Sequence, residues 1–139
     1  MRKLLLLLWV TAACTSAMQD DIMRDIAEER VSTTPAFLDE PGLQVLICGS
    51  AGPINAPGRA SACAAVIAGG RIWIVDVGAG SAANFAQWGI PMSDLNGILL
   101  THFHSDHITE LGEYNLQSWA AGRDAPLAVY GPEGVAKVV

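Results

Sequence analysis

The sequence predicts an α/β domain with a mixed sheet, and three observations support that prediction. From Leu43 onward, short runs rich in β-branched residues alternate with segments of helical length. Two of these runs are separated only by Gly69 and Gly70, a pair typical of a tight β-hairpin. Later runs alternate with helices, which is typical of parallel strands joined by crossovers. A hairpin followed by such alternation requires both antiparallel and parallel neighbours in one sheet.

Turn and cap residues set the expected boundaries of each element. Ser81 is expected to cap the first helix, and Gly122 to end the long one. The unbroken Ile98, Leu99 and Leu100 predict a strand that is buried on both faces. In order, we expect strands at Leu43–Cys48, Ala62–Ala68 and Arg71–Val77, a helix at Ser81–Trp88, a strand at Gly97–Thr101, a helix at Thr109–Ala121, a strand at Leu127–Tyr130 and a helix from Glu133.

Composition limits the size and the partners of the protein. The 139 residues are 51% hydrophobic, which is enough for one domain with a buried core. The net charge of −6 disfavours a broad electrostatic contact with nucleic acid or with an anionic membrane. A small local site for phosphate remains compatible with this charge.

The N-terminus predicts export. Arg2 and Lys3 precede an apolar run, residues 4–10, which is about half of the ~20 residues that a membrane-spanning helix needs. Residues 1–17 are therefore interpreted as a signal peptide, and the mature protein as periplasmic, secreted or lipid-anchored in a bacterial envelope. Lipoprotein processing before Cys14 and ordinary cleavage after Ala17 both fit. Residues 18–42, with seven acidic side chains, are interpreted as a tether that contains a short helix.

Two cysteines remain beyond the leader. Cys48 and Cys63 could pair in an oxidising compartment. We favour unpaired, buried cysteines on neighbouring strands, because cysteine is among the residues most often fully buried.

The chemistry is expected where the fourth strand ends. All three histidines of the chain lie in the motif His102-x-His104-x-Asp106-His107. In an extended segment alternate residues face the same way, so His102, His104 and Asp106 can converge, while the turn into the next helix brings His107 round from another direction. Neutral imidazoles and a carboxylate suit Zn²⁺ or another borderline metal, with Mn²⁺ or Fe²⁺ as alternatives. Four ligands in one loop fit two neighbouring ions better than one.

A plainer interpretation makes the motif a polar helix entry. Ser105 or Asp106 would then cap the helix, and the imidazoles would be solvated. We favour the metal site because active sites in α/β sheets lie beyond the carboxyl ends of strands.

The segment Leu100–Ile108 resembles the signature loop of the metallo-β-lactamase superfamily. Ile74–Gly80 resembles the strand of that superfamily that ends in an aspartate and glycines. Gly49–Pro53 and Arg59–Ser61 are similar to its glycine-rich loop and the following strand entry, and Pro126–Pro132 resembles the branch with ribonuclease Z and the phosphodiesterase-like and arylsulfatase-like hydrolases. The resemblance covers residues 43–139 and implies the first half of an αββα sandwich.

The resemblance also implies roles for single residues. His102 and His104 would bind one metal ion, and Asp106 and His107 the second, with Asp106 also touching the attacking water. Asp76 would orient the loop without binding metal, although a strand-end aspartate that caps a turn explains it as well. Thr101 is expected to be structural.

Full-length members of the superfamily supply further metal ligands that have no match here. No histidine follows His107, and Asp124 is the only later aspartate. We therefore expect a fragment with an incomplete site. The favoured function of its parent is metal-dependent hydrolysis of small phosphate or sulfate esters; the alternatives are a ribonuclease Z-type nuclease and a non-catalytic metal-binding fragment.

Overall fold

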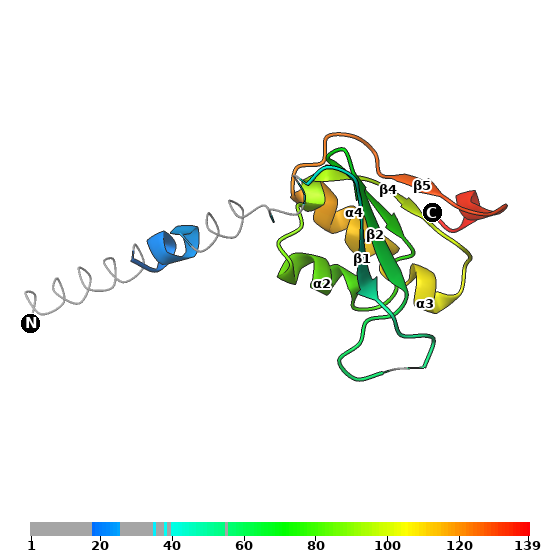
Figure 1. Cartoon of the computed structure of the whole chain (residues 1–139). Helices are drawn as coiled ribbons and strands as arrows, with labels where there is room; N and C mark the ends of the chain where they lie inside the picture. The colour runs from blue at the N-terminus through cyan, green and yellow to red at the C-terminus, as the bar shows by residue number, and fades with distance from the viewer. Residues whose placement is uncertain (1–17, 26–34, 36–37, 39, 55) are drawn as a thin grey trace, which may run out of the picture. The chain divides into compact units, whose positions relative to one another are not determined.

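The computed structural model describes residues 18–25, 35, 38, 40–54 and 56–139 (Figure 1). The chain divides into two compact units, Met1–Thr33 and Thr34–Val139. In the first unit, residues 18–25 are helical and exposed. The predicted signal peptide and Cys14 lie outside the described residues. Within the described ranges, none of the helices has both the length and the apolar character needed to cross a bilayer.

The second unit is built on one five-stranded mixed sheet. Its strands lie side by side in the order in which they occur in the chain. Strand β2 is antiparallel to β1 and to β3, and β4 is parallel to β3 and to β5. The strands are β1 Leu43–Gly49, β2 Cys63–Ala68, β3 Arg71–Val75, β4 Leu95–Leu99 and β5 Ala128–Tyr130. The predicted mixed sheet is confirmed.

The β2–β3 hairpin turns at the predicted glycine pair. Ala68 pairs with Arg71, and Gly69 and Gly70 have φ angles of 56° and 71°. Both angles are left-handed, and glycine reaches that region without the steric cost of a Cβ. This turn aligns the two strands in the register that puts Ile67 and Ile72 in the core.

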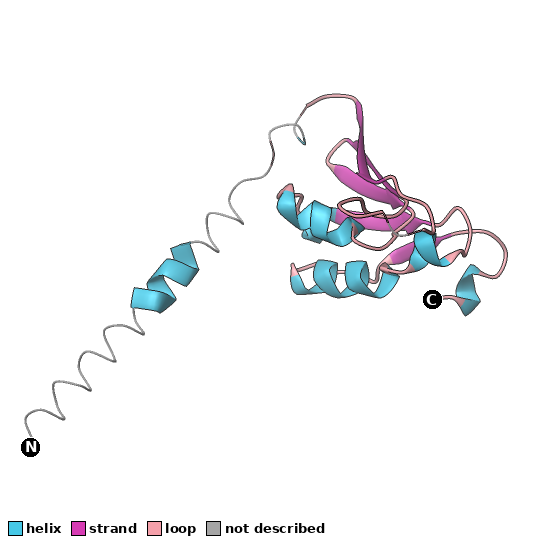
Figure 2. Ribbon diagram, turned by 90° about the horizontal axis from the view of Figure 1, so that it is seen from below, coloured by secondary structure: helices cyan, strands magenta, loops and turns pink. Residues whose placement is uncertain are grey.

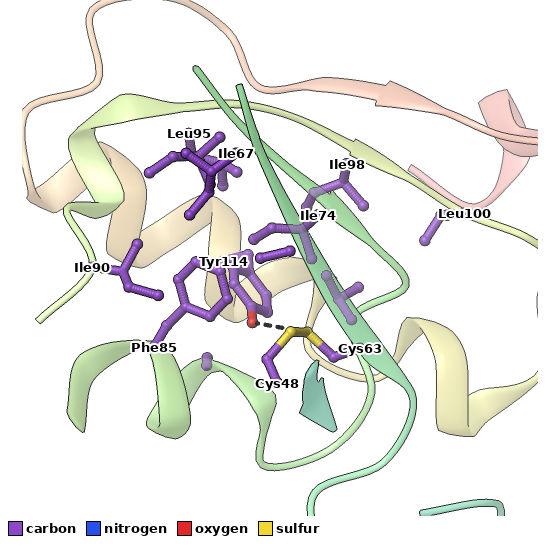
Figure 3. Packing of buried hydrophobic residues seen from close by; sticks show 14 residues of the cluster. Cys48, Cys63, Ile67, Ile74, Phe85, Ile90, Leu95, Ile98, Leu100 and Tyr114 are labelled. Atoms are coloured by element: carbon purple, nitrogen blue, oxygen red, sulfur yellow. Dashed lines mark hydrogen bonds between the residues drawn. A yellow bond between two sulfur atoms is a disulfide. The ribbon is translucent and has the colours of Figure 1, made fainter. Parts of the chain in front are cut away.

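The helices cover one face of the sheet (Figure 2). Helix α2 is Ser81–Gln87, α3 is Ser105–Ile108 and α4 is Leu111–Ala120, and short 3₁₀ turns occupy Met92–Asp94 and Val135–Lys137. Phe85 of α2 meets Tyr114 of α4 edge to face, with ring centroids 5.6 Å apart. These rings pack on inward-facing strand residues such as Ile67 and Ile74, as Figure 3 shows.

Several predicted boundaries need correction. The helix expected over Thr109–Ala121 is two helices, because α3 already begins at Ser105 and a break separates it from α4. The helix expected from Glu133 is only a 3₁₀ turn. The strand predicted as Gly97–Thr101 is Leu95–Leu99, and its burial on both faces is wrong, since Leu99 is 37% exposed.

Ser81 does not cap α2. The cap position is Gly80, and the carboxylate of Glu110 binds the helix start instead. It accepts hydrogen bonds from the backbone N–H groups of Gly80 (2.6 Å) and Ala82 (2.8 Å) and from the Ser81 hydroxyl (3.2 Å). A carboxylate suits this position because unpaired N–H groups and the helix dipole attract negative charge.

Cys48 and Cys63 form a disulfide, so the expectation that they stay unpaired is wrong. Their Cα atoms lie 5.0 Å apart. Gly49 is the partner of Cys63 in the ladder, and the register shifts between Ile47 and Gly49, so Cys48 lies at an irregularity and turns into the core. Sequence separation alone could not reveal this register.

Candidate metal centre

The predicted ligands meet at the edge where β3 and β4 end. Because these strands are parallel, their carboxyl ends share one edge of the sheet. The chain leaves β3 at Asp76, whose N–H donates to the Leu99 carbonyl (2.9 Å). The next N–H, that of Val77, donates to the His107 carbonyl (2.7 Å). Two backbone bonds thus attach the segment after β3 to the end of β4 and to the last histidine of the motif.

Asp76 is the buried centre of this arrangement. It is 5% exposed and has a φ angle of 60°, the only positive φ outside glycine in the described part of the chain. Aspartate tolerates this left-handed conformation better than most residues. Its Oδ1 accepts the Thr101 N–H (2.8 Å), and its Oδ2 accepts the Thr101 hydroxyl (2.8 Å) and the His107 ring Nδ1 (2.7 Å). The side chain therefore connects the segment after β3 to Thr101 and to His107.

These contacts define the tautomers of two histidines. The Asp76 carboxylate only accepts hydrogen bonds, so the Nδ1 of His107 carries a proton, and in the neutral ring Nε2 keeps a free lone pair. The hydroxyl proton of Thr101 goes to Asp76, so the Thr101 oxygen accepts from the Nδ1 of His102, 3.0 Å away. In both neutral rings Nε2 is thus unprotonated, and an unprotonated ring nitrogen can bind a metal ion.

The rings and the second carboxylate lie close together. The His102 ring centroid is 4.5 Å from that of His104 and 4.0 Å from that of His107. The Nε2 of His107 is 3.5 Å from an Asp106 carboxylate oxygen. With bonds of about 2.1 Å at a tetrahedral angle, two ligands of one ion lie about 3.4 Å apart. The separation of the His107 Nε2 and the Asp106 oxygen therefore suits two ligands of one ion.

The donor set fits a divalent cation in type, and the Asp106–His107 pair fits one in spacing as well. Across the described residues, however, no three His, Cys, Asp or Glu side chains meet in a geometry that could hold one ion together. The structure brings the side chains of the four predicted ligands close together, and Asp106 and His107 are the pair whose spacing suits one ion.

Asp106 depends on close backbone packing. It is 8% exposed and lies in the first turn of α3. A Cβ at Gly78 would collide with the Asp106 carbonyl oxygen and with Ser61. Only glycine permits this approach, which places the loop after β1 against the start of α3.

Two expectations about the motif need correction. Asp106 does not belong to the extended run, because helix α3 begins at Ser105 and brings Asp106 inward. In the alternative of a capped helix entry, the expected cap is wrong: the cap position is His104, and neither Ser105 nor Asp106 makes a side-chain cap bond. Thr101 has a larger part than expected, since it joins Asp76 to His102. Its position directly before the first histidine was the available signal.

Comparisons with known proteins agree with this architecture. The family model of the anti-Pycsar protein Apyc1 matches residues 43–138. Ribonuclease Z of Mycobacterium marinum is 41% identical over 100 residues, which are 70% of this chain and 36% of that protein. The metallo-β-lactamase fold protein YhfI from Bacillus subtilis superposes with a TM-score of 0.61 at 22% identity, over 69% of this chain and 39% of that one. Human tRNase Z, short form, superposes with a TM-score of 0.60 at 22% identity, over 68% of this chain and 36% of that one.

These relatives correct the expected partner. The acidic composition led us to disfavour nucleic acid and to place small esters ahead of a ribonuclease Z-type function, whereas the curated relatives include ribonucleases Z, which act on RNA. Net charge misled because it does not describe the local charge at a site. Residues 43–139 hold seven acidic and four basic side chains, so the matched region is itself acidic.

The chain spans about a third of the length of the curated relatives that it matches. The match to the family model includes all five strands of the sheet and the complete histidine motif. The solved structures share the mixed sheet with its flanking helices. The chain therefore belongs to the family of the anti-Pycsar protein Apyc1 and has the fold of the metallo-β-lactamases.

Proposed function

We propose that the protein to which this chain contributes is a metal-dependent phosphodiester hydrolase that acts on RNA. The observation that carries the proposal is the cluster of His102, His104, Asp106 and His107 around the buried Asp76. The cluster lies within residues 43–138, which the family model matches, and the chain is 41% identical to a ribonuclease Z over 100 residues. The first preference from sequence, a small phosphate or sulfate ester, has no comparable support.

Each residue would have a distinct role in the site. His102 and His104 would hold one ion, and Asp106 and His107 the other. Bound divalent ions would lower the pKa of water and stabilise negative charge on the phosphate oxygens. Asp106 would also accept a hydrogen bond from the attacking water and so orient it. Asp76 would hold the His107 ring in the tautomer that presents Nε2. Zn²⁺ is the favoured ion, with Mn²⁺ and Fe²⁺ as alternatives.

The test compares three substrates with the full-length protein. We expect hydrolysis of a labelled RNA oligonucleotide and of bis-p-nitrophenyl phosphate, and none of p-nitrophenyl sulfate. Chelation should abolish the activity, and added Zn²⁺ or Mn²⁺ should restore it. The substitution His102→Ala should lower kcat/KM on RNA by about 100-fold or more, since it removes a metal ligand.

Asp106→Asn and Asp124→Asn form a matched pair of variants. Each exchanges one carboxylate for an amide, but Asp124 is exposed and lies outside the cluster. We expect strong loss in the first and normal activity in the second. Wild-type activity in His102→Ala or Asp106→Asn would refute the assignment of ligands. A full-length protein that binds metal but cleaves neither phosphodiester would favour the non-catalytic alternative.

We also propose that the mature protein is exported, with residues 1–17 as the leader. The Cys48–Cys63 disulfide supports export, because disulfides persist in oxidising compartments. The intact mass of the protein from its native source tests the proposal. A lipid mass at Cys14 would favour lipoprotein processing, and a new N-terminus at Met18 would favour ordinary cleavage. A retained Met1 with reduced cysteines would contradict export.

A further inference from the structure

We propose that the Thr101 hydroxyl is a positioning group that connects His102 to the carboxylate of Asp76. One buried carboxylate would then orient a histidine from each expected metal pair: His107 directly and His102 through Thr101. The inference rests on the proposed metal binding by these histidines. It goes further by making the two halves of the site depend on one another.

The hydrogen-bond directions carry the argument. A threonine hydroxyl has one proton to donate, and the Thr101 proton goes to Asp76 Oδ2 at 2.8 Å. The remaining polar atom near that oxygen is the Nδ1 of His102 at 3.0 Å. The hydroxyl oxygen can only accept from it. The Nδ1 proton of His102 is thereby fixed in place, and Nε2 is left free on the other side of the ring.

The backbone and the side chain of Thr101 have different roles: the N–H anchors the loop, and the hydroxyl orients the His102 ring. The Thr101 N–H donates to the other oxygen of Asp76, at 2.8 Å, and this bond does not depend on the side chain. In Thr101→Val the backbone bond and the side-chain shape remain, while the hydroxyl is lost. The His102 ring would then lose its Nδ1 partner and could exchange tautomers and rotate, whereas His107 would keep its own bond to Asp76.

The geometry therefore predicts coupling between the two positions. Asp76→Asn removes a carboxylate that serves both histidines, so it should weaken both ions. Thr101→Val should weaken only the ion held with His102. In the double variant, the effects on that ion should be clearly less than additive, because both substitutions interrupt the same connection.

The experiment measures metal binding to the full-length protein by calorimetric titration with Zn²⁺ and by the visible spectrum of the Co²⁺ form. We expect Thr101→Val to weaken one of two binding steps by about 10-fold or more, in line with losses from removing groups that orient metal ligands. Thr101→Ser, which keeps the hydroxyl, should restore affinity to within about 3-fold of wild type. Thr109→Val is the matched control, since the Thr109 hydroxyl bonds only to the Ser105 carbonyl.

A second measurement does not depend on how the variants fold. In the metal-free wild type, ¹⁵N chemical shifts of the histidine rings should show His102 and His107 with the proton on Nδ1. A proton on Nε2 of His102 would overturn the inference. Unchanged two-step binding in Thr101→Val, or equal losses in Thr101→Ser and Thr101→Val, would also overturn it.

The two proposals can fail separately. If the wild type binds no divalent ion, the proposed function fails, and the ring shifts still decide whether Thr101 orients His102. If the wild type binds two ions and Thr101→Val binds them equally well, only the positioning role is lost.

Discussion

At the scale of the residue, Asp76 combines an unfavourable backbone with three accepted hydrogen bonds. A left-handed aspartate costs on the order of 1 kcal/mol, and it persists where the surroundings determine it. Here the three donors are the backbone N–H of Thr101, the hydroxyl of Thr101 and the ring Nδ1 of His107. The strain therefore marks the point where the sheet edge and the histidine motif are joined.

Gly78→Ala tests this junction at one atom. The added methyl group would meet the Asp106 carbonyl and Ser61, so the backbone must shift. We expect destabilisation of about 1–3 kcal/mol, typical of overpacking, together with weaker metal binding. Thermal unfolding and metal titration measure the two effects. Gly112→Ala is the control: it adds the same methyl group in open space on a helix and should be neutral or slightly stabilising.

The burial of the Tyr114 phenol predicts that the protein loses stability at alkaline pH. Burial raises the pKa of its phenol well above the ordinary value, and the Glu110 carboxylate adds to the rise. The folded state therefore keeps a proton that the unfolded chain releases above about pH 10. Stability from this group is complete below that pH and is lost as the pH rises further.

Tyr114→Phe should reduce that alkaline loss. The unfolding midpoint, followed from pH 8 to pH 12, should fall less steeply in this variant than in wild type. Tyr130→Phe, at a tyrosine that is 53% exposed, should leave the slope unchanged. Equal slopes in wild type and Tyr114→Phe would contradict the assignment.

At the scale of the element, helix α2 depends on a side chain from a distant segment. The Glu110 carboxylate takes three hydrogen bonds at the start of α2, from a position between α3 and α4. Glu110→Ala should cost about 1–2 kcal/mol in unfolding free energy, the range for loss of a helix cap. Glu113→Ala, which removes an exposed contact with Gln117, should cost less than about 0.5 kcal/mol. Equal costs would show that the capping role is wrong.

The disulfide stabilises the entry to β2. It closes a loop between cysteines 15 residues apart in sequence. Loop-closure entropy predicts a stabilisation of about 3 kcal/mol for a loop of this size. Chemical unfolding of the double variant Cys48→Ala/Cys63→Ala should show a loss near that value. Reduction of the wild type should lower its unfolding free energy by a similar amount, and reduction of the variant should have no effect. That result would confirm that the disulfide is responsible.

At the scale of the whole molecule, the two faces of the sheet differ. The helices α2 and α4 cover one face (Figure 2), whereas the outer face of β1 exposes Leu43, Val45 and Ile47 by 69%, 55% and 60%. Trp73 and Tyr130 lie on the same outer side, with ring centroids 5.9 Å apart. Exposed apolar faces of this kind are typically covered by another layer, as in a sandwich of two sheets.

Charged substitutions on this face test whether it is covered in the full-length protein. Val45→Glu/Ile47→Glu should destabilise that protein by several kcal/mol, because the charges would be buried between layers. Trp119→Glu, at an apolar residue that is 68% exposed on α4, serves as the control and should have little effect. Thermal unfolding of the two variants gives the comparison. A small loss of stability in Val45→Glu/Ile47→Glu would mean that the outer face of β1 stays open to solvent.

The sequence by itself determined the features that depend on neighbours in the chain. The Gly69–Gly70 hairpin, the alternation of strands and helices and the His102–His107 motif are local patterns, and the structure contains all of them. The four candidate ligands were readable because they lie within six consecutive residues. Their chemistry requires little knowledge of the rest of the fold.

Only the tertiary structure decided the contacts between distant segments. The bond from Asp76 to Thr101 spans 25 residues, that from Glu110 to Ala82 spans 28, and the disulfide depends on an irregular register in β1. Such contacts follow from how strands pair and helices pack. Hydrophobic periodicity indicates which face of an element is buried, but it does not specify which distant side chain that face will meet.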